Sequence, residues 1–159
     1  MRGSARRLRE KRSAYRGLLL DTMYLLPIFG VDVELETSLH GLLEEGDPLY
    51  YNPLSLVEIK WVYYRLVRLG VVSITEARRN YIEGFRALLR DKRFRRTPVT
   101  TPAIERVADD LHDMGIKDYF DRMIAATAIV GRLRLVTDDK DLKDIEERYR
   151  EWLSRRKGG

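Results

Sequence analysis

The sequence predicts an α/β protein in which helices cover both faces of a mainly parallel sheet. Two observations support this fold class. Short apolar runs with the length of buried strands lie at 17–20 and 133–136, and stretches with the apolar spacing of amphipathic helices occupy much of the remaining chain. Because strands that alternate with helices are joined by crossover connections, they pair in parallel and are covered by helices on both sides.

The individual elements follow in chain order. After the strand at 17–20, a short helix is expected from Thr22 to about Phe29, where Pro27 and Gly30 break the pattern. Longer helices are expected over 56–69, 75–94, 102–114 and 117–132, with a charged helix at 141–156. Short strands are expected at 97–100 ("TPVT") and 133–137 ("LRLVT"). Neither a repeat nor a low-complexity linker is present, so 17–155 is predicted to form one domain.

Composition restricts the class of protein. The chain has 159 residues, of which 35% are charged, and no apolar run approaches the ~20 residues of a membrane span. The basic N-terminus lacks the apolar stretch of a secretory signal. With no cysteine there is neither a disulfide nor a thiolate metal site. We therefore expect a cytoplasmic protein without a membrane partner.

Positive charge is concentrated at the N-terminus. Residues 1–16 carry seven Arg or Lys residues against one Glu, a net charge of +6, whereas the remaining chain sums to −1 because the whole carries +5. This basic arm is typical of a polyanion-binding segment, and a solvated tail is the equal alternative. A second basic cluster lies at 90–96. The candidate nucleic-acid contacts are Arg6, Arg7, Arg9, Lys11, Arg12, Arg93, Arg95 and Arg96.

Acidic residues follow two of the predicted strands directly. Asp21 ends the apolar run of 17–20, and Asp138 and Asp139 follow the strand that ends near Thr137. In parallel α/β sheets the ligand crevice lies outside the carboxyl ends of the strands. A carboxylate beside so many apolar residues is also costly to bury without a partner. Solubility alone does not explain acids at both positions.

Two further acids lie near helix starts. Glu58 follows Ser55 by three residues, which is the pattern of a capping box, and Asp121 follows the potential N-cap Asp118 by the same interval. Capping is therefore one interpretation of both. The other is that all four acids converge at the strand ends, where their mutual repulsion would require a hard divalent cation such as Mg²⁺ or Mn²⁺. His40 and His112 stand apart from any nucleophile pattern.

The order of these acids resembles that of the PIN-domain family. The similarity runs from about Leu18 to Leu142 and is most specific in "DYFDRMIAATAIVGRLRLVTDDKDL", where an acid, a small-residue helix, a strand and Thr-x-Asp follow one another. It is closest to the VapC-like ribonuclease toxins. The resemblance implies a three-layer α/β/α fold and metal-dependent cleavage of RNA. It also implies a homodimer and inhibition by a small antitoxin protein.

Position by position, the resemblance implies a catalytic and metal-binding set. Its members are Asp21, Glu58, Asp121 and Asp139. Supporting roles fall to Thr22, Asp118, Thr137 and Asp138, with Thr137 expected to orient Asp139. Asp138 departs from the family pattern, so which of Asp138 and Asp139 faces the metal stays open.

The sequence thus predicts a Mg²⁺- or Mn²⁺-dependent endoribonuclease that acts on RNA as the toxin of a toxin–antitoxin pair. The alternative is a module with the same fold that binds RNA or a partner protein and has little catalytic activity. Because a domain kept only for binding does not need a repulsive carboxylate cluster, we favour the nuclease.

Overall fold

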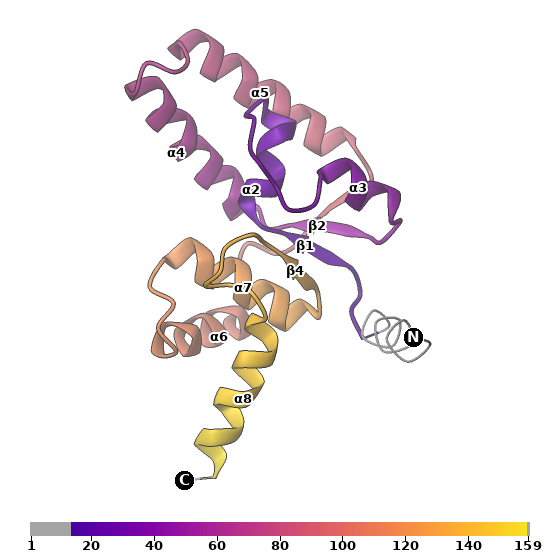
Figure 1. Ribbon diagram of the computed structural model, residues 1–159, viewed down its shortest axis with the longest axis vertical. Helices are drawn as coiled ribbons and strands as arrows, with labels where there is room; N and C mark the ends of the chain where they lie inside the picture. Colours follow the sequence, from indigo (N-terminus) through magenta and orange to yellow (C-terminus); the bar gives the residue numbers. More distant parts are fainter. Residues whose placement is uncertain (1–13, 159) are drawn as a thin grey trace.

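The computed structural model describes residues 14–158 of the chain (Figure 1). Its elements, in order, are β1 (Leu18–Leu20), α2 (Thr22–Leu25), the 3₁₀ helix η1 (Leu26–Phe29), α3 (Leu39–Glu44), β2 (Leu49–Tyr51), α4 (Leu54–Arg68), α5 (Ile74–Arg90), β3 (Phe94–Arg96), α6 (Pro102–Asp113), α7 (Tyr119–Gly131), β4 (Arg134–Val136) and α8 (Ile145–Lys157). Among the helices of 14–158, none is both long and apolar enough to cross a bilayer.

The strands form a four-stranded sheet with the order β3-β2-β1-β4, and each neighbouring pair is parallel. The register pairs Leu20 of β1 with Val136 of β4, so the two strands end side by side. Every carboxyl end therefore points to the same edge of the sheet, where the chain turns into the following loop or helix.

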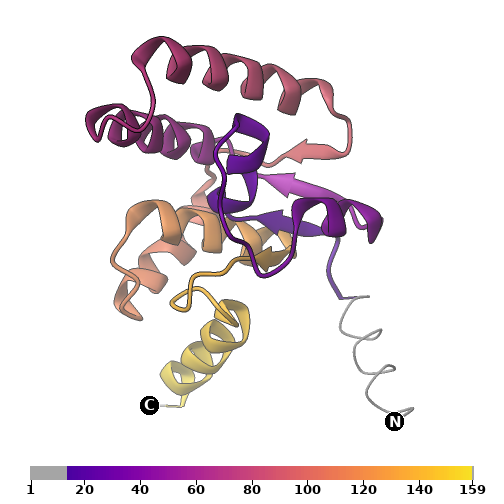
Figure 2. The ribbon, with the colours of Figure 1, turned by 45° about the horizontal axis from the view of Figure 1, so that its top comes forward.

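Helices cover the two faces of the sheet in separate layers. In Figures 1 and 2, α4 and α5 lie on one side of the strands, and α6, α7 and α8 lie on the other. Alternate residues of β1 point to opposite layers: Leu18 and Leu20 pack into the core beneath α4 and α5, and Leu19 packs against Ile124 and Ala128 of α7. The predicted three-layer α/β/α fold is confirmed.

One buried amide fixes how the layers meet at the carboxyl edge. Asn52 follows β2 and is completely buried. Its Nδ2 donates to Thr127 Oγ1 of α7 at 2.9 Å and to the Val99 carbonyl at 3.1 Å, and its Oδ1 accepts from the Leu54 N–H at 2.9 Å. Asn52 therefore joins the start of α4 to the middle of α7.

The sequence analysis misplaced the strands of one half of the sheet. β2 was not predicted, and the strand expected at 97–100 lies instead at Phe94–Arg96, beginning at the last residue of the helix predicted over 75–94. β3 is an edge strand whose two arginines are exposed, so it lacks the apolar alternation that identifies a half-buried strand. The short helix α3 was missed as well, whereas α4 to α8 lie within a few residues of their predicted bounds.

Candidate metal centre

Four segments bring acids together at the carboxyl edge of the sheet. Asp21 follows β1 and Asp139 follows β4, and Glu58 and Asp121 lie in the early turns of α4 and α7. Because β1 and β4 are neighbours and α7 packs against both α4 and β4, these elements approach one another at one edge. The charges of Asp21, Asp139 and Glu58 all act on Asp121. The sequence prediction that these acids lie near one another agrees with this arrangement.

Asp21 is the most buried of the acids, with 7% of its surface exposed. Its Oδ1 accepts from the Thr22 N–H at 2.8 Å, and its Oδ2 accepts from the Thr137 hydroxyl at 2.7 Å. Burial raises the pKa of Asp21; the two hydrogen bonds oppose this rise, and the charges of Asp139 and Asp138 add to it. The carboxylate is thus held in one orientation at the end of β1.

Thr137 contacts a different acid from the one expected. Its hydroxyl donates to Asp21, and the same oxygen accepts from the Asp139 backbone N–H at 3.0 Å. The side chain of Thr137 therefore orients the carboxylate of Asp21 and the main chain of Asp139. This double role follows from the pairing of β1 with β4, which no local pattern reveals.

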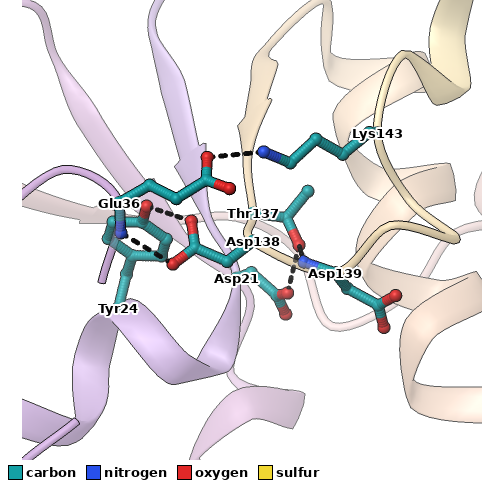
Figure 3. A network of polar contacts seen from close by, with 7 residues as sticks. All are labelled: Asp21, Tyr24, Glu36, Thr137, Asp138, Asp139 and Lys143. Atoms are coloured by element: carbon teal, nitrogen blue, oxygen red, sulfur yellow. Dashed lines mark hydrogen bonds and ion pairs between the residues drawn. The ribbon is translucent and has the colours of Figure 1, made fainter. Parts of the chain in front are cut away.

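Asp138 and Asp139 point to different surroundings, as Figure 3 shows. Asp138 accepts from the Tyr24 hydroxyl at 2.5 Å and from the Glu36 N–H at 2.9 Å, and the Glu36 carboxylate pairs with Lys143 at 2.5 Å. Asp138 thus fastens the loop after β4 to α2 and to the segment before α3. Asp139 instead lies close enough to Asp21 and Asp121 to raise the pKa of both.

The tightest group of carboxylates is formed by Glu58, Asp118 and Asp121, which offer oxygens within 4.8 Å of one another. Asp118 was predicted only as a supporting residue. It is the N-cap of α7, with Oδ1 accepting from the Asp121 N–H at 3.0 Å, so the capping interpretation applies to it. The charge of Asp118 raises the pKa of both Glu58 and Asp121.

Glu58 does not close a capping box. Helix α4 begins at Leu54 with Pro53 as its N-cap, so Ser55 already lies inside the helix. The Ser55 hydroxyl is buried and accepts from the Thr22 hydroxyl at 2.9 Å. Thr22, expected to support Asp21, thus does so through its backbone N–H, and its side chain lies between Ser55 and Glu58.

The acids repel one another strongly. Burial raises the pKa of Asp121 to about 7, and the charges of Asp118, Asp21, Asp139 and Glu58 contribute in that order. Burial also raises the pKa of Glu58; its contact with Thr22 opposes the rise, and the charges of Asp21 and Asp118 add to it. Oxygen ligands of this kind suit Mg²⁺ or Mn²⁺, whose charge would remove the repulsion. The donor set therefore fits a hard divalent cation.

The predicted basic contacts are only partly described by the structure. Arg6, Arg7, Arg9, Lys11 and Arg12 lie outside the described residues. Arg93 forms a two-pronged ion pair with Asp91, Nη2 to Oδ2 at 2.7 Å and Nε to Oδ1 at 3.0 Å, which neutralises it. Arg95 and Arg96 are exposed on β3.

The residue that sequence reasoning missed at this edge is Asn52, which positions α4, and with it Glu58, against α7. The signal in the sequence is a polar residue directly after Tyr51 and before Pro53.

Comparison with known families identifies the class. The family model for the PIN domain matches residues 18–148, which span every element from β1 to the start of α8. The chain belongs to the PIN-domain family. Members of this family are generally nucleases that use divalent metals, in keeping with the carboxylate group at the edge of the sheet. Among curated proteins, no sequence matches the chain significantly.

Proposed function

We propose that the protein is a Mg²⁺- or Mn²⁺-dependent endoribonuclease. The observation that carries the proposal is the convergence of Glu58, Asp118 and Asp121, with oxygens within 4.8 Å of one another, beside the buried Asp21. The charges that raise the pKa of Asp121 are the carboxylates of Asp118, Asp21, Asp139 and Glu58, so like charges face one another. A cluster that destabilises itself in this way is typical of a functional site.

Each acid has a distinct part in the proposed site. Glu58, Asp118 and Asp121 would hold the cation, and Asp21, oriented by Thr137 and Thr22, would complete the shell together with Asp139. When bound, the ion supplies Lewis-acid activation of water and neutralises charge that develops on the phosphate oxygens. No histidine is needed as a base: His40 and His112 lie at the surface beside Glu44 and Asp113.

The biological role that we propose is that of a toxin in the cytoplasm, with a small antitoxin protein as partner and a homodimer as the assembly. Support for a protein partner comes from exposed apolar side chains on α4 and the turn after it. They are Val57, Trp61, Tyr64, Leu69 and Val71, with exposed fractions of 47% or more. Apolar and aromatic residues gathered on one surface are characteristic of protein interfaces.

An RNA-cleavage assay tests the proposed activity. The wild type should cleave a single-stranded RNA in Mg²⁺ or Mn²⁺ and lose that activity in EDTA. Asp121→Asn should lower the rate by about 10²–10³, because one charge of the site is removed while its shape is kept. Asp109→Asn, an exposed position on α6, is the matched control and should retain the wild-type rate. Equal cleavage in EDTA, or by Asp121→Asn, would contradict the proposal.

A further inference from the structure

A recess lies at the opposite end of α7 from the acids. It has a volume of about 330 Å³ and is open to solvent between the last turn of α7, the sheet and the segment that enters α6. Its walls are mostly apolar, with contributions from Pro98, Ile104, Val130 and Leu133. Ten residues of α7 separate Asp121 from Gly131, which corresponds to roughly 15 Å along the helix axis. The recess is therefore distinct from the candidate metal centre.

Two arginines flank the aromatic ring that lines this recess. The guanidinium carbon of Arg16 lies 5.8 Å from the centroid of the Tyr50 ring, and that of Arg95 lies 5.9 Å from the same centroid. The Nη1 of Arg95 also donates to the Tyr50 hydroxyl at 3.4 Å, and Arg16 is fixed by a 2.8 Å hydrogen bond from Nε to the Gly131 carbonyl. The residues that line the recess include Arg16, Arg96 and Tyr50, and Arg95 lies against the Tyr50 ring.

Arg16 and Arg95 differ from Arg93 in the partners that residues 14–158 offer them. Within residues 14–158, neither Arg16 nor Arg95 forms an ion pair with a carboxylate. Arg93, two residues before Arg95, provides the contrast, because Asp91 accepts hydrogen bonds from it through both oxygens. Arg16, which lines the recess, and Arg95, which lies against the lining residue Tyr50, are suited to an anion, and their planar donors match the oxygens of a phosphate.

The volume of the recess and the chemistry of its residues together indicate a small ligand that has a flat ring and a negative charge. A volume of about 330 Å³ lies at the small end of the range for small-molecule sites. A flat ring can rest on the apolar wall or on Tyr50, since bases stack on aromatic side chains and guanidinium planes. An uncharged apolar group would fill the recess but leave both guanidinium groups without a counter-ion.

We propose that this recess binds one nucleoside monophosphate unit, with the base against the apolar wall beside Tyr50 and the phosphate at Arg16 and Arg95. The unit is either part of an RNA strand or a free nucleotide, which share this chemistry. Only the first source rests on the proposed nuclease function. In that case the site is an anchor for RNA roughly 15 Å from the acids, measured along α7.

Calorimetric titration of the full chain with AMP in EDTA tests the proposal, because EDTA removes any cation from the acidic end. AMP should bind, and adenosine, which lacks the phosphate, should bind more weakly. Arg95→Gln should weaken AMP binding about tenfold or more, the usual effect of losing a charge-assisted hydrogen bond. The matched control is Arg93→Gln, which removes an equal charge from the same segment but should change the affinity less than about twofold.

A second pair of variants tests the recess without removing a charge. Val130→Trp places a large side chain at an exposed helical position that lines the recess, and it should block AMP. Ile82→Trp, at an exposed position on α5, is the control and should bind AMP normally. Absence of AMP binding at millimolar concentration, or an equal effect of Arg93→Gln and Arg95→Gln, overturns the proposal.

Binding of a short single-stranded RNA shows whether the nucleotide is part of an RNA strand or free. Val130→Trp is combined with Asp121→Asn for this measurement, so that the RNA is not cleaved while it binds. If Val130→Trp weakens binding of this RNA and of AMP, the unit belongs to an RNA strand; if it weakens only AMP, the ligand is a free nucleotide. AMP binding without any RNA cleavage by the wild type would contradict the proposed nuclease but support this site. Cleavage without AMP binding would contradict this site alone.

Discussion

The two ends of helix α7 carry opposite charges, and the residues around each end differ in kind. At its start, Asp118 and Asp121 lie beside Glu58, so like charges face one another. At its end, Arg16 donates to the Gly131 carbonyl and rests near the Tyr50 ring. Acids at a helix N-terminus and cations at its C-terminus are both favoured by the helix dipole. The helix dipole therefore stabilises the charges at both ends. The two ends differ in the residues that their charged groups contact.

The difference lies in what each charge contacts. Arg16, at the end of α7, contacts both a carbonyl and an aromatic ring, so it contributes to stability as well as to the proposed ligand site. The acids at the start of α7 mainly contact other acids, and the pKa of Asp121 is raised to about 7 as a result of burial and of this repulsion. We infer that the acidic end lowers the stability of the metal-free protein.

The dependence of stability on pH provides the largest expected effect. The pKa of Asp121 rises from 3.8 to about 7 on folding, so the folded state retains a proton that the unfolded state releases. This stabilisation is complete below about pH 4 and is lost as the pH rises through about 7. We expect a loss of about 1–2 kcal/mol after allowing for solvent screening of a partly exposed group.

Thermal unfolding in EDTA at pH 5 and pH 8 measures this effect. Asp121→Asn cannot titrate at this position, so its advantage in Tm over the wild type should grow from pH 5 to pH 8. A constant difference between the two proteins would show that Asp121 titrates normally.

Substitutions at the two ends should change stability in opposite directions. At pH 8 without metal, Asp121→Asn should stabilise the fold, because it removes one repelling charge. Arg16→Gln should destabilise it by roughly 0.5–1.5 kcal/mol, through loss of the hydrogen bond to Gly131. Chemical denaturation of both variants compares them directly. If both lower the free energy of unfolding, the proposed contrast between the ends is wrong.

Asp21 is not a suitable position for that comparison, although the sequence alone suggests it. Both of its oxygens accept hydrogen bonds, from Thr22 and Thr137. An asparagine would present an N–H₂ group to one of these donors, so Asp21→Asn loses a buried hydrogen bond together with the charge.

Deletion of the basic arm should have the smallest of the expected effects, a change in the affinity for RNA. Deleting residues 2–13, which contain six Arg or Lys residues, should weaken RNA binding and flatten its dependence on salt, since fewer counterions are released. Each lost phosphate contact should reduce the slope of log affinity against log salt by about 0.7 for a single strand. Filter binding at several salt concentrations provides the slopes, and equal slopes would reduce the arm to a solvated tail.

Sequence patterns were informative where local chemistry is strong. The apolar run before Asp21, the small-residue helix after Asp121 and the strand before Thr137 all identified elements of the acidic edge correctly. The other half of the sheet was less visible. All four strands have three residues, so length is not the reason; β3 is built from Phe94 and two exposed arginines, and packing on its neighbours defines it more than its own pattern does.

Details within the site depended on contacts between distant segments. Asp138 and Asp139 are adjacent in sequence, and the Tyr24 hydroxyl and the Glu36 N–H hold Asp138 toward α2 and the segment before α3. Likewise, Asp118 joined the tight carboxylate group because α4 and α7 meet there, an arrangement that Asn52 helps to fix. Spacing along the chain carries no information about such partners.

The central claim is that the acidic end of α7 binds a divalent cation, and metal binding tests it most directly. Titration of the apo protein with Mn²⁺, followed by electron paramagnetic resonance, reports the free ion without any RNA. We expect saturable binding that Asp121→Asn weakens at least about tenfold and that Arg16→Gln leaves unchanged. No binding at millimolar Mn²⁺, or equal losses in the two variants, would contradict the account.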